Sequence, residues 1–458
     1  MLCSRHAKMV SSKTLTFKVM RKNLELVSPA ESIPYEFKYL SDIDDQDSFR
    51  RYFPLINFYE KNPSMEGKDP VKIIRDAVAK ALVFYYPLAG RLREYVGRKL
   101  VVECTGQGVV FIEADADVML HHFGDTLYPP FPNLEDLLPH MPNHDDEIIN
   151  SPLLLIQVTR LKCGGFIIAY LFNHTMCDAA GLFQFLSAVG ELACGATLPS
   201  IMPVWQRHLL SARHPPRPSI PHPEFHHLVS DICIPHQQMA ERSFFFSAAD
   251  ISTLRRSLPP HLQSCSRFEI VAGCAWRCRT IALSPKPDEE VRFLGVVDMR
   301  KRMNPPLPLG YYGNALAALP AVTTAEELSK KPLHLAVELV RKAKEEATEE
   351  YLRSVADLMV MRGRPPSGPI LTKIGPGANY YMVSDFTHGG FKQVDLGWGA
   401  AAYGGIAIGV DCPFYQTTWY VSFNNVIVVP VCLPLKALQI FEKQLQMMMM
   451  AARTTSAL

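Results

Sequence analysis

The sequence predicts an α+β fold with mixed, α/β-type sheets, divided between two domains of similar size. Apolar runs bounded by glycine and proline indicate strands in both halves of the chain, and amphipathic stretches with helical spacing lie between them. A chain of 458 residues also exceeds what one hydrophobic core usually serves. Residues 206–238 are rich in proline and histidine without periodicity, which is typical of a linker. We therefore expect an N-terminal domain at 1–205 and a C-terminal domain at 239–458.

The first elements of the N-terminal half are a helix and a predicted hairpin. Asp69 and Pro70 provide an N-cap and a first-turn proline for a helix that ends before Pro87. Residues 100–115 then contain two apolar runs around a glycine-rich turn at 106–108, which predicts a β-hairpin.

A second predicted hairpin, residues 153–172, turns at Gly164-Gly165 and leads directly to His174. A new amphipathic pattern starts at Asp178, whose carboxylate is favoured by the open N–H groups of a first helical turn, and it continues to about Ala193. His174 is therefore expected at a strand-to-helix crossover, where a side chain faces the mouth of a sheet.

The C-terminal half repeats this kind of pattern. We expect strands at 244–246 and 291–298, helices at 248–254 and 268–276, one long helix at 332–361, apolar alternation over 405–429, and a last helix after Pro434. Two halves of similar size joined by a linker imply a cleft between them, where ligands bind preferentially.

Composition excludes several classes of function. The formal charge of +2 and the pI near 8.0 give no nucleic-acid signature, and no basic cluster is interleaved with aromatic residues. We expect no membrane partner, since the first residues lack the apolar segment of a secretory signal and the apolar tail at 426–435 is too short to span a bilayer. The 11 cysteines include no C-x-x-C pair, so we expect reduced thiols in a cytoplasmic protein and no metal site.

The pattern His-x-x-x-Asp occurs three times in this chain. On the order of one match is expected by chance alone, so the pattern is a weak signal and context must select among the copies. The copies are His121/Asp125, His174/Asp178 and His227/Asp231. Only the middle copy follows an apolar strand and precedes the small residues 179–181, which allow backbone or ligand to come close. His174 and Asp178 are the candidate site.

Five motifs in order make the chain resemble the plant BAHD acyltransferases, which move an acyl group from coenzyme A to an alcohol or amine. The motifs are YPLAGR at 86–91, FNHTMCDAAGL at 172–182, SRFEIVAGCAWRCRT at 266–280, VDMRKRMNPPLPLGYYGN at 297–314 and VDLGWG at 394–399. Within the family, SDIDDQ at 41–46 and LLLIQVTRLKCGG at 153–165 are most similar to the benzyl alcohol, hexenol and methanol acyltransferases. The resemblance implies two domains like chloramphenicol acetyltransferase with a solvent channel between them.

The resemblance also implies that His174 is the general base, reached by acyl-CoA from one face of the channel and by the acceptor from the other. Imidazole suits this role, because a thioester is already activated and a weakly nucleophilic hydroxyl needs only a base. Cys177, inside the motif, is weighed as a covalent nucleophile and not favoured. Asp178 permits two interpretations: a carboxylate that orients the imidazole, as in a triad, or a structural partner of an arginine. The family favours the second, with Arg300 as first choice and Arg302 as second.

Further site residues come from the resemblance alone. Asp395, Gly397, Trp398 and Gly399 match a structural motif remote from the chemistry, in which Leu396 replaces the usual Phe. Ser384 matches a hydroxyl that faces the oxyanion in relatives, whereas Phe386 lacks the indole N–H often found there and is expected to line the acceptor pocket. Tyr312 and Asn314 match positions near the coenzyme A channel.

These inferences predict a cytoplasmic, monomeric O-acyltransferase without a bound cofactor. Acyl-CoA is its co-substrate, the acyl group is acetyl or aromatic (for example benzoyl), and the acceptor is a small alcohol such as benzyl alcohol or hexenol. The alternatives are an acyltransferase for amines or larger specialised-metabolite alcohols, and a non-catalytic binding relative. The role of residues 1–8 is open.

Overall fold

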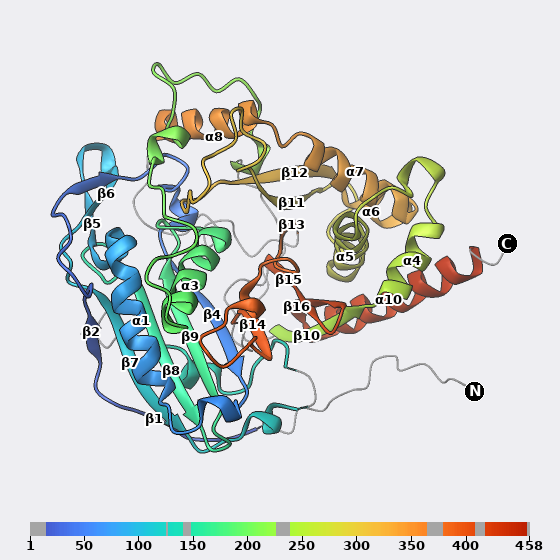
Figure 1. The fold of residues 1–458 in the computed structure, drawn as a ribbon. Coiled ribbons are helices and arrows are strands. Elements are labelled where there is room, and N and C mark those ends of the chain that lie inside the picture. The colour runs from blue at the N-terminus through green and yellow to red at the C-terminus, as the bar shows by residue number, and fades with distance from the viewer. Residues whose placement is uncertain are drawn as a thin grey trace.

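A computed structural model of the chain describes residues 15–124, 127–140, 148–225, 239–363, 379–407 and 417–455. Two halves, each built on a mixed sheet with helices packed on it, lie side by side (Figure 1). The predicted α+β class and two-domain organisation are confirmed. Predictions that involve residues 1–8, Asp125 and the tract 226–238 concern positions outside the described ranges.

The first sheet belongs mainly to the N-terminal half. Its strand order is β1-β7-β8-β9-β4-β14, with β2 also paired to β7, and only β7 and β8 run parallel. The strands are β1 (Val19–Arg21), β2 (Glu25–Val27), β4 (Tyr52–Tyr59), β7 (Val109–Ala116), β8 (Leu154–Leu161), β9 (Phe166–Asn173) and β14 (Tyr403–Ile406). Helices α1 (Pro70–Phe84) and α3 (Ala179–Ala193) pack together and bury their apolar residues in the same core as β4, β8 and β9. The short helix α2 (Leu134–Leu137) packs in a separate core with residues of β4 and β9.

The predicted hairpin at 100–115 is wrong. Strand β6 (Leu100–Glu103) lies between β3 (Phe37–Tyr39) and β5 (Arg91–Glu94) in a separate small sheet, whereas β7 enters the large one. Gly108, with φ of 95°, lets the chain cross between the two sheets, because a Cβ there would lie 2.3 Å from the carbonyl oxygen of Val27. The second predicted hairpin, β8 and β9, is confirmed.

The second sheet has the strand order β10-β16-β15-β13-β11-β12, in which β13 runs parallel to both of its neighbours. The strands are β10 (Met239–Phe246), β11 (Glu290–Asp298), β12 (Leu316–Thr324), β13 (Tyr380–Asp385), β15 (Thr417–Phe423) and β16 (Val426–Pro434). The helices of this half are α4 (Ala248–Arg256), α5 (Arg267–Leu283), α6 (Ala325–Lys330), α7 (Leu333–Glu345), α8 (Glu349–Arg362) and α10 (Leu435–Thr455). Helix α5 contacts α4, α6, α7 and α10, and together they bury the apolar core of this half.

The single long helix predicted for residues 332–361 is instead two helices, α7 and α8. Thr348 has an extended backbone, and its side-chain hydroxyl accepts a hydrogen bond from the backbone N–H of Tyr351. A threonine in this position is an N-cap, which starts a new helix and turns the chain away from the previous one. Amphipathic spacing alone carries no sign of such a break.

The C-terminal half also contributes to the first sheet. Strand β14 pairs with β4, and the segment before it buries Leu396 and Trp398 in the core of the N-terminal half. The linear domain boundaries predicted at 205 and 239 therefore do not describe this exchanged segment. Within the described ranges, no helix is both long and apolar enough to cross a bilayer.

Candidate active site

His174 lies directly after the last residue of β9, at the crossover to α3. Its backbone N–H donates to the carbonyl of Arg51 at 2.9 Å. The strand ends here because the side-chain oxygen of Asn173 accepts the backbone N–H of Thr175 at 3.1 Å and the Thr175 hydroxyl at 2.7 Å, which turns the chain. The sequence-based location of His174 at a strand-to-helix crossover is confirmed.

Aromatic rings surround the imidazole of His174. The ring of Phe49 lies parallel to it with a centroid distance of 4.4 Å, and the rings of Phe53 and Phe172 lie at 5.5 and 5.6 Å. Burial, helped by the positive charge of Arg51, lowers the pKa of His174 to about 4. The side chain is half-buried and its Nδ1 is enclosed, and a hydrogen bond to its own backbone and the Asn314 side chain oppose this lowering of the pKa. At neutral pH the site therefore presents a neutral imidazole.

The buried carboxylate of Asp178 faces away from His174. It accepts two hydrogen bonds from Arg300, at 2.8 and 2.9 Å, and one each from the backbone N–H groups of Gly181 and Ala315, both at 3.0 Å. Burial alone would raise the pKa of Asp178, but Arg300 and these hydrogen bonds lower it below the ordinary value. The predicted contact between Asp178 and Arg300 is present, whereas Arg302 donates to backbone carbonyls elsewhere. The geometry favours the structural interpretation of Asp178 over the triad.

The Asp395–Gly399 motif forms a separate turn in the first half, away from His174. The Asp395 carboxylate accepts the N–H groups of Gly397 at 2.7 Å and Gly399 at 2.8 Å. Trp398 packs against Phe166, at the opposite end of the eight-residue strand β9 from His174. At about 3.4 Å per residue, the two ends are roughly 24 Å apart. The motif therefore anchors the exchanged segment and does not reach the histidine.

Ser384 lies on β13 directly opposite Trp419 of β15. The Trp419 ring is 5.4 Å from the ring of Phe53, which also contacts the imidazole of His174. This chain of contacts puts the second sheet's Ser384–Trp419 pair near the histidine. Phe386, expected in the acceptor pocket, packs parallel to Phe391 with the ring centroids 6.1 Å apart, and it is partly buried against the first core.

Tyr312 and Asn314, predicted to lie near the coenzyme A channel, both have side chains that are buried in protein contacts. Tyr312 packs against Tyr85 and Trp205, with ring centroids 5.2 and 5.9 Å away. Asn314, with no exposed surface, donates its side-chain N–H groups to the carbonyl of His174 at 2.8 Å and to Asp44 at 3.0 Å. These residues stabilise the loop that carries His174.

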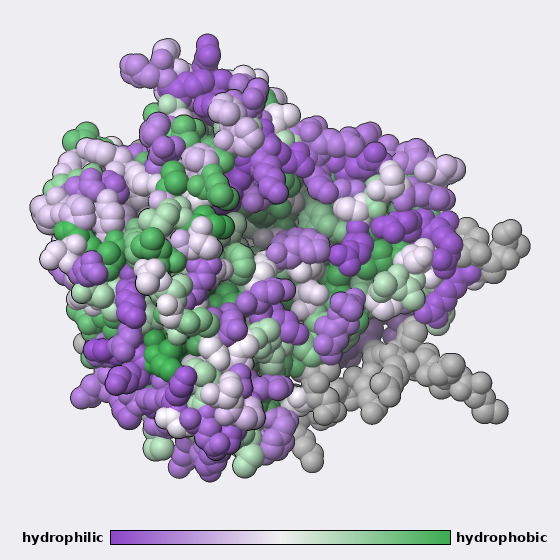
Figure 2. All heavy atoms as spheres, viewed as in Figure 1, coloured by the Kyte–Doolittle hydropathy of each residue, from purple (hydrophilic) through white to green (hydrophobic). Residues whose placement is uncertain are grey.

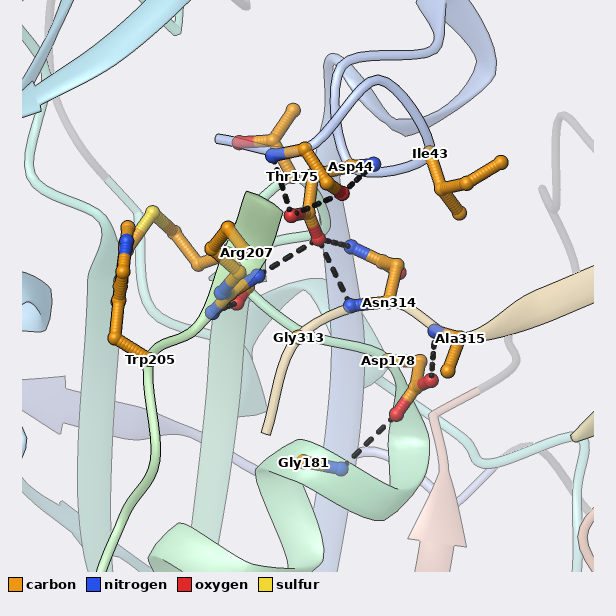
Figure 3. A network of polar contacts seen from close by, with 12 residues as sticks. Ile43, Asp44, Thr175, Asp178, Gly181, Trp205, Arg207, Gly313, Asn314 and Ala315 are labelled. Atoms are coloured by element: carbon orange, nitrogen blue, oxygen red, sulfur yellow. Dashed lines mark hydrogen bonds and ion pairs between the residues drawn. The ribbon is translucent and has the colours of Figure 1, made fainter. Parts of the chain in front are cut away.

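A buried ion pair between Asp44 and Arg207 completes this support (Figure 3). Asp44 accepts the guanidinium of Arg207 at 2.7 Å and the backbone N–H of Asn314 at 2.8 Å. Arg207 also donates to the carbonyl of Met176 at 2.7 Å. Its guanidinium fits against the chain because residue 313 is a glycine: a Cβ added at that position would lie 2.3 Å from the guanidinium. The loop that carries His174 is thus held by three segments distant in sequence.

Sequence reasoning did not identify Phe49, Asp44 or Arg207. Asp44 lies within the SDIDDQ motif, but its spacing does not distinguish it from the neighbouring aspartates. Arg207 lies in the segment predicted to be an irregular linker, so no pattern marked it.

Cys177 is buried, and burial raises the pKa of its thiol, which argues against a nucleophilic role. In the described part of the chain, no group of three or more metal-ligating side chains is found.

Comparisons with known proteins agree with this fold. A family model described as the transferase family matches residues 17–448. The chain is 53% identical to a benzyl alcohol O-benzoyltransferase of Nicotiana tabacum over 446 residues, which cover 96% of this chain and 95% of that protein. Vinorine synthase has a similar structure, with a TM-score of 0.70 at 22% identity over 92% of this chain and 96% of that one. The F. sporotrichioides TRI101 structure, complexed with coenzyme A and T-2, has a TM-score of 0.70 at 15% identity over 89% and 97% of the two chains.

The fold and the motifs define a two-domain acyltransferase. With the family model matching most of its length, the chain belongs to the transferase family of BAHD acyltransferases.

The pKa of His174 predicts the pH dependence of turnover. Because a protonated imidazole cannot accept a proton, kcat/KM is expected to stay level through neutral pH and to fall only as the pH approaches about 4. The profile is measured on protein shown by circular dichroism to remain folded at each pH. A midpoint near the ordinary histidine value of about 6.5 would contradict this environment.

Replacing Asp178 separates its two interpretations. In the structural one, Asp178→Asn lowers the free energy of unfolding by about 3–5 kcal/mol, because Arg300 loses its buried partner. Folded protein keeps kcat within about tenfold of wild type, whereas loss of a triad aspartate costs about 10⁴-fold. Asp298→Asn, which removes the half-exposed carboxylate on the same arginine, is the control and is expected to cost about 1 kcal/mol or less. Urea unfolding measures the stability of both variants, and steady-state kinetics measures their kcat. A loss of kcat of about 10⁴-fold in folded Asp178→Asn would support the orienting role instead.

Proposed function

We propose that the protein transfers an acyl group from coenzyme A to the hydroxyl of a small alcohol, with His174 as the general base. Membership of the acyltransferase family supports the reaction class. The observation that carries the assignment to His174 is its neutral, half-buried imidazole at the end of β9, surrounded by three aromatic rings.

The reaction needs one proton acceptor and no covalent enzyme intermediate. Nε2 of His174 takes the proton of the acceptor hydroxyl while its oxygen forms a bond to the thioester carbonyl carbon. The tetrahedral intermediate then collapses, the C–S bond breaks, and the proton on Nε2 passes to the departing thiolate. The products are an ester and free coenzyme A. Such a base contributes typically ~10²–10⁴ in rate.

Ser384 is the proposed donor to the oxyanion of that intermediate. Its position opposite Trp419, which reaches the histidine through Phe53, supports this role. A hydroxyl that faces the developing charge would stabilise it without a metal ion.

The rings around the imidazole support a small apolar or aromatic acceptor. Phe49, Phe53 and Phe172 all contact the imidazole, and no described carboxylate shares this contact. The benzyl alcohol acceptor in the name of the tobacco relative has the same chemistry. On the face drawn in Figure 2, the surface is hollowed where the two halves meet, and apolar residues line the hollow. We therefore propose benzyl alcohol or a short aliphatic alcohol as acceptor, with acetyl-CoA or benzoyl-CoA as donor.

Two alternatives stay open. The same base would serve an amine or a larger alcohol, since the shape of the pocket decides between them. A non-catalytic relative would have no need for a neutral imidazole at this crossover. The monomeric state and the cytoplasmic location remain predictions from the sequence.

A panel of donors and acceptors tests the proposed function. Purified protein is supplied with acetyl-CoA or benzoyl-CoA and with benzyl alcohol, hexenol or benzylamine, and free coenzyme A is measured. We expect acceptor-dependent release with an alcohol, at least about tenfold faster than with the matched amine. Benzylamine has the same ring as benzyl alcohol and is therefore the control for the hydroxyl. Preferred turnover of the amine, or no acceptor-dependent release with any pair, would contradict the proposal.

A further inference from the structure

Trp419 and Phe53 form a pair of aromatic rings where the two halves meet, beside His174. Phe53 belongs to β4 of the first sheet, and Trp419 belongs to β15 of the second. The ring centroids lie 5.4 Å apart and the planes make an angle of 68°, so the edge of one ring meets the face of the other. Each residue is only 5% exposed. The two rings are therefore in direct contact inside the protein.

Trp419 and Ser384 project from the second sheet toward the first half. They are direct neighbours in the parallel pairing of β13 with β15. The residues next to them in the chain, Val383 and Tyr420, are buried in the core of the second half. Because successive side chains of a strand alternate between its two faces, Ser384 and Trp419 face the other way. In agreement, Trp419 is buried in the core cluster of the first half.

In the proposed mechanism, the acyl group of the donor lies beside this ring pair. The oxyanion forms on the acyl carbonyl, so Ser384, as its donor, lies next to the acyl carbon. The acceptor oxygen reaches the same carbon from the side of His174. Trp419 is the neighbour of Ser384, and the Phe53 ring is 5.5 Å from the imidazole of His174. The substituent on the acyl carbon therefore meets the rings of Trp419 and Phe53.

The ring pair leaves no room for an aromatic acyl group. Further along the two strands, Leu55 of β4 and Val421 of β15 lie in the same apolar cluster as Val428, and all three are at most 3% exposed. A flat ring stacked between two others needs about 3.5–4.0 Å to each of them, or about 7 Å in all. The rings of Trp419 and Phe53 are only 5.4 Å apart. A benzoyl ring must displace the buried indole, whereas the methyl group of an acetyl donor requires no such movement.

We infer that Trp419, packed on Phe53, selects the acyl donor and restricts the site to short acyl groups such as acetyl. Forcing a larger group into a filled core strains the side chains around it. Trp419 is thus a specificity-determining residue, which acts by steric exclusion and takes no part in proton transfer. The inference rests on the proposed acyl transfer at His174, and it leaves the choice of alcohol unchanged.

The test is the ratio of kcat/KM for benzoyl-CoA to kcat/KM for acetyl-CoA, measured with benzyl alcohol as the common acceptor. Wild type is expected to favour acetyl-CoA by at least about tenfold. Trp419→Ala is expected to raise the ratio by about 10- to 100-fold, because removal of the indole opens the space that a benzoyl ring needs. The fraction of folded protein cancels in the ratio, so a loss of stability alone does not change it. Equal or better use of benzoyl-CoA by wild type, or a ratio in Trp419→Ala within about threefold of wild type, would overturn the inference.

Trp398→Ala is the matched control for the loss of a buried tryptophan. Trp398 is 8% exposed and packs against Phe166, at the opposite end of β9 from His174. The variant is expected to lose stability and to keep the donor ratio of wild type. A change in the ratio equal to that of Trp419→Ala would assign both effects to general loosening of the core and overturn the inference.

Equilibrium binding separates failure of this inference from failure of the proposed function. Calorimetric titration with acetyl-CoA and with benzoyl-CoA requires no turnover. Wild type is expected to bind acetyl-CoA at least about tenfold more tightly than benzoyl-CoA, and Trp419→Ala is expected to remove that difference. If binding follows this pattern while no acceptor releases coenzyme A, the proposed function fails and the selection by Trp419 stands. Equal or tighter binding of benzoyl-CoA to wild type, or binding of neither thioester, overturns the inference.

Phe53→Leu covers the case in which Trp419→Ala does not fold. It removes the other ring of the pair and keeps an apolar side chain, so it is expected to raise the donor ratio by a smaller factor, about 3- to 10-fold. Because Phe53 also contacts the imidazole, kcat with both donors is expected to change in parallel, and only the ratio reports on the space beside the indole. An unchanged ratio in folded Phe53→Leu would overturn the inference.

Discussion

The buried ion pair between Asp178 and Arg300 joins the two halves of the molecule at the active site. Asp178 caps α3 in the first half, and its remaining hydrogen bonds reach Arg300 and Ala315 of the second. A buried pair of this kind adds little net stability over apolar packing, but loss of one partner is costly, so it specifies a single arrangement. Acyl transfer depends on that arrangement, because the base, the hydroxyl and the thioester must meet in one geometry.

Burial of His174 serves catalysis at the expense of stability in acid. A folded-state pKa of about 4 lies below the ordinary value of about 6.5, so the unfolded chain binds more protons between these two pH values. The contribution of this group therefore favours the unfolded state increasingly as the pH falls through that window, and it is neutral above it. As a result, one nitrogen of the imidazole stays unprotonated at every pH near neutrality. Phe49, Phe53 and Phe172 surround the ring.

Much of the fold was predictable because the local sequence patterns agreed with the tertiary structure. Periodicity alone predicted the strand before His174, the helix after Asp178 and the strand at 291–298. The predictions failed where distant partners decide. Gly108 serves a crossover between sheets that only the position of Val27 explains, and Thr348 is a cap only because the chain turns there. In the site, His174 and the Asp178–Arg300 contact could be predicted from motifs. Asp44 could not, since nothing local distinguishes one aspartate among several, and its partners come from residues 207 and 314.

The measurement that tests the central claim most directly is the single-turnover rate of acyl transfer in wild type and in His174→Ala, both saturated with the preferred donor and alcohol. Single-turnover conditions separate chemistry from product release. With His174 as the base, the rate falls by about 10²–10⁴-fold in the variant, and the affinity for acyl-CoA changes little. Equal rates in the two proteins would leave the reaction class intact and remove His174 from its centre.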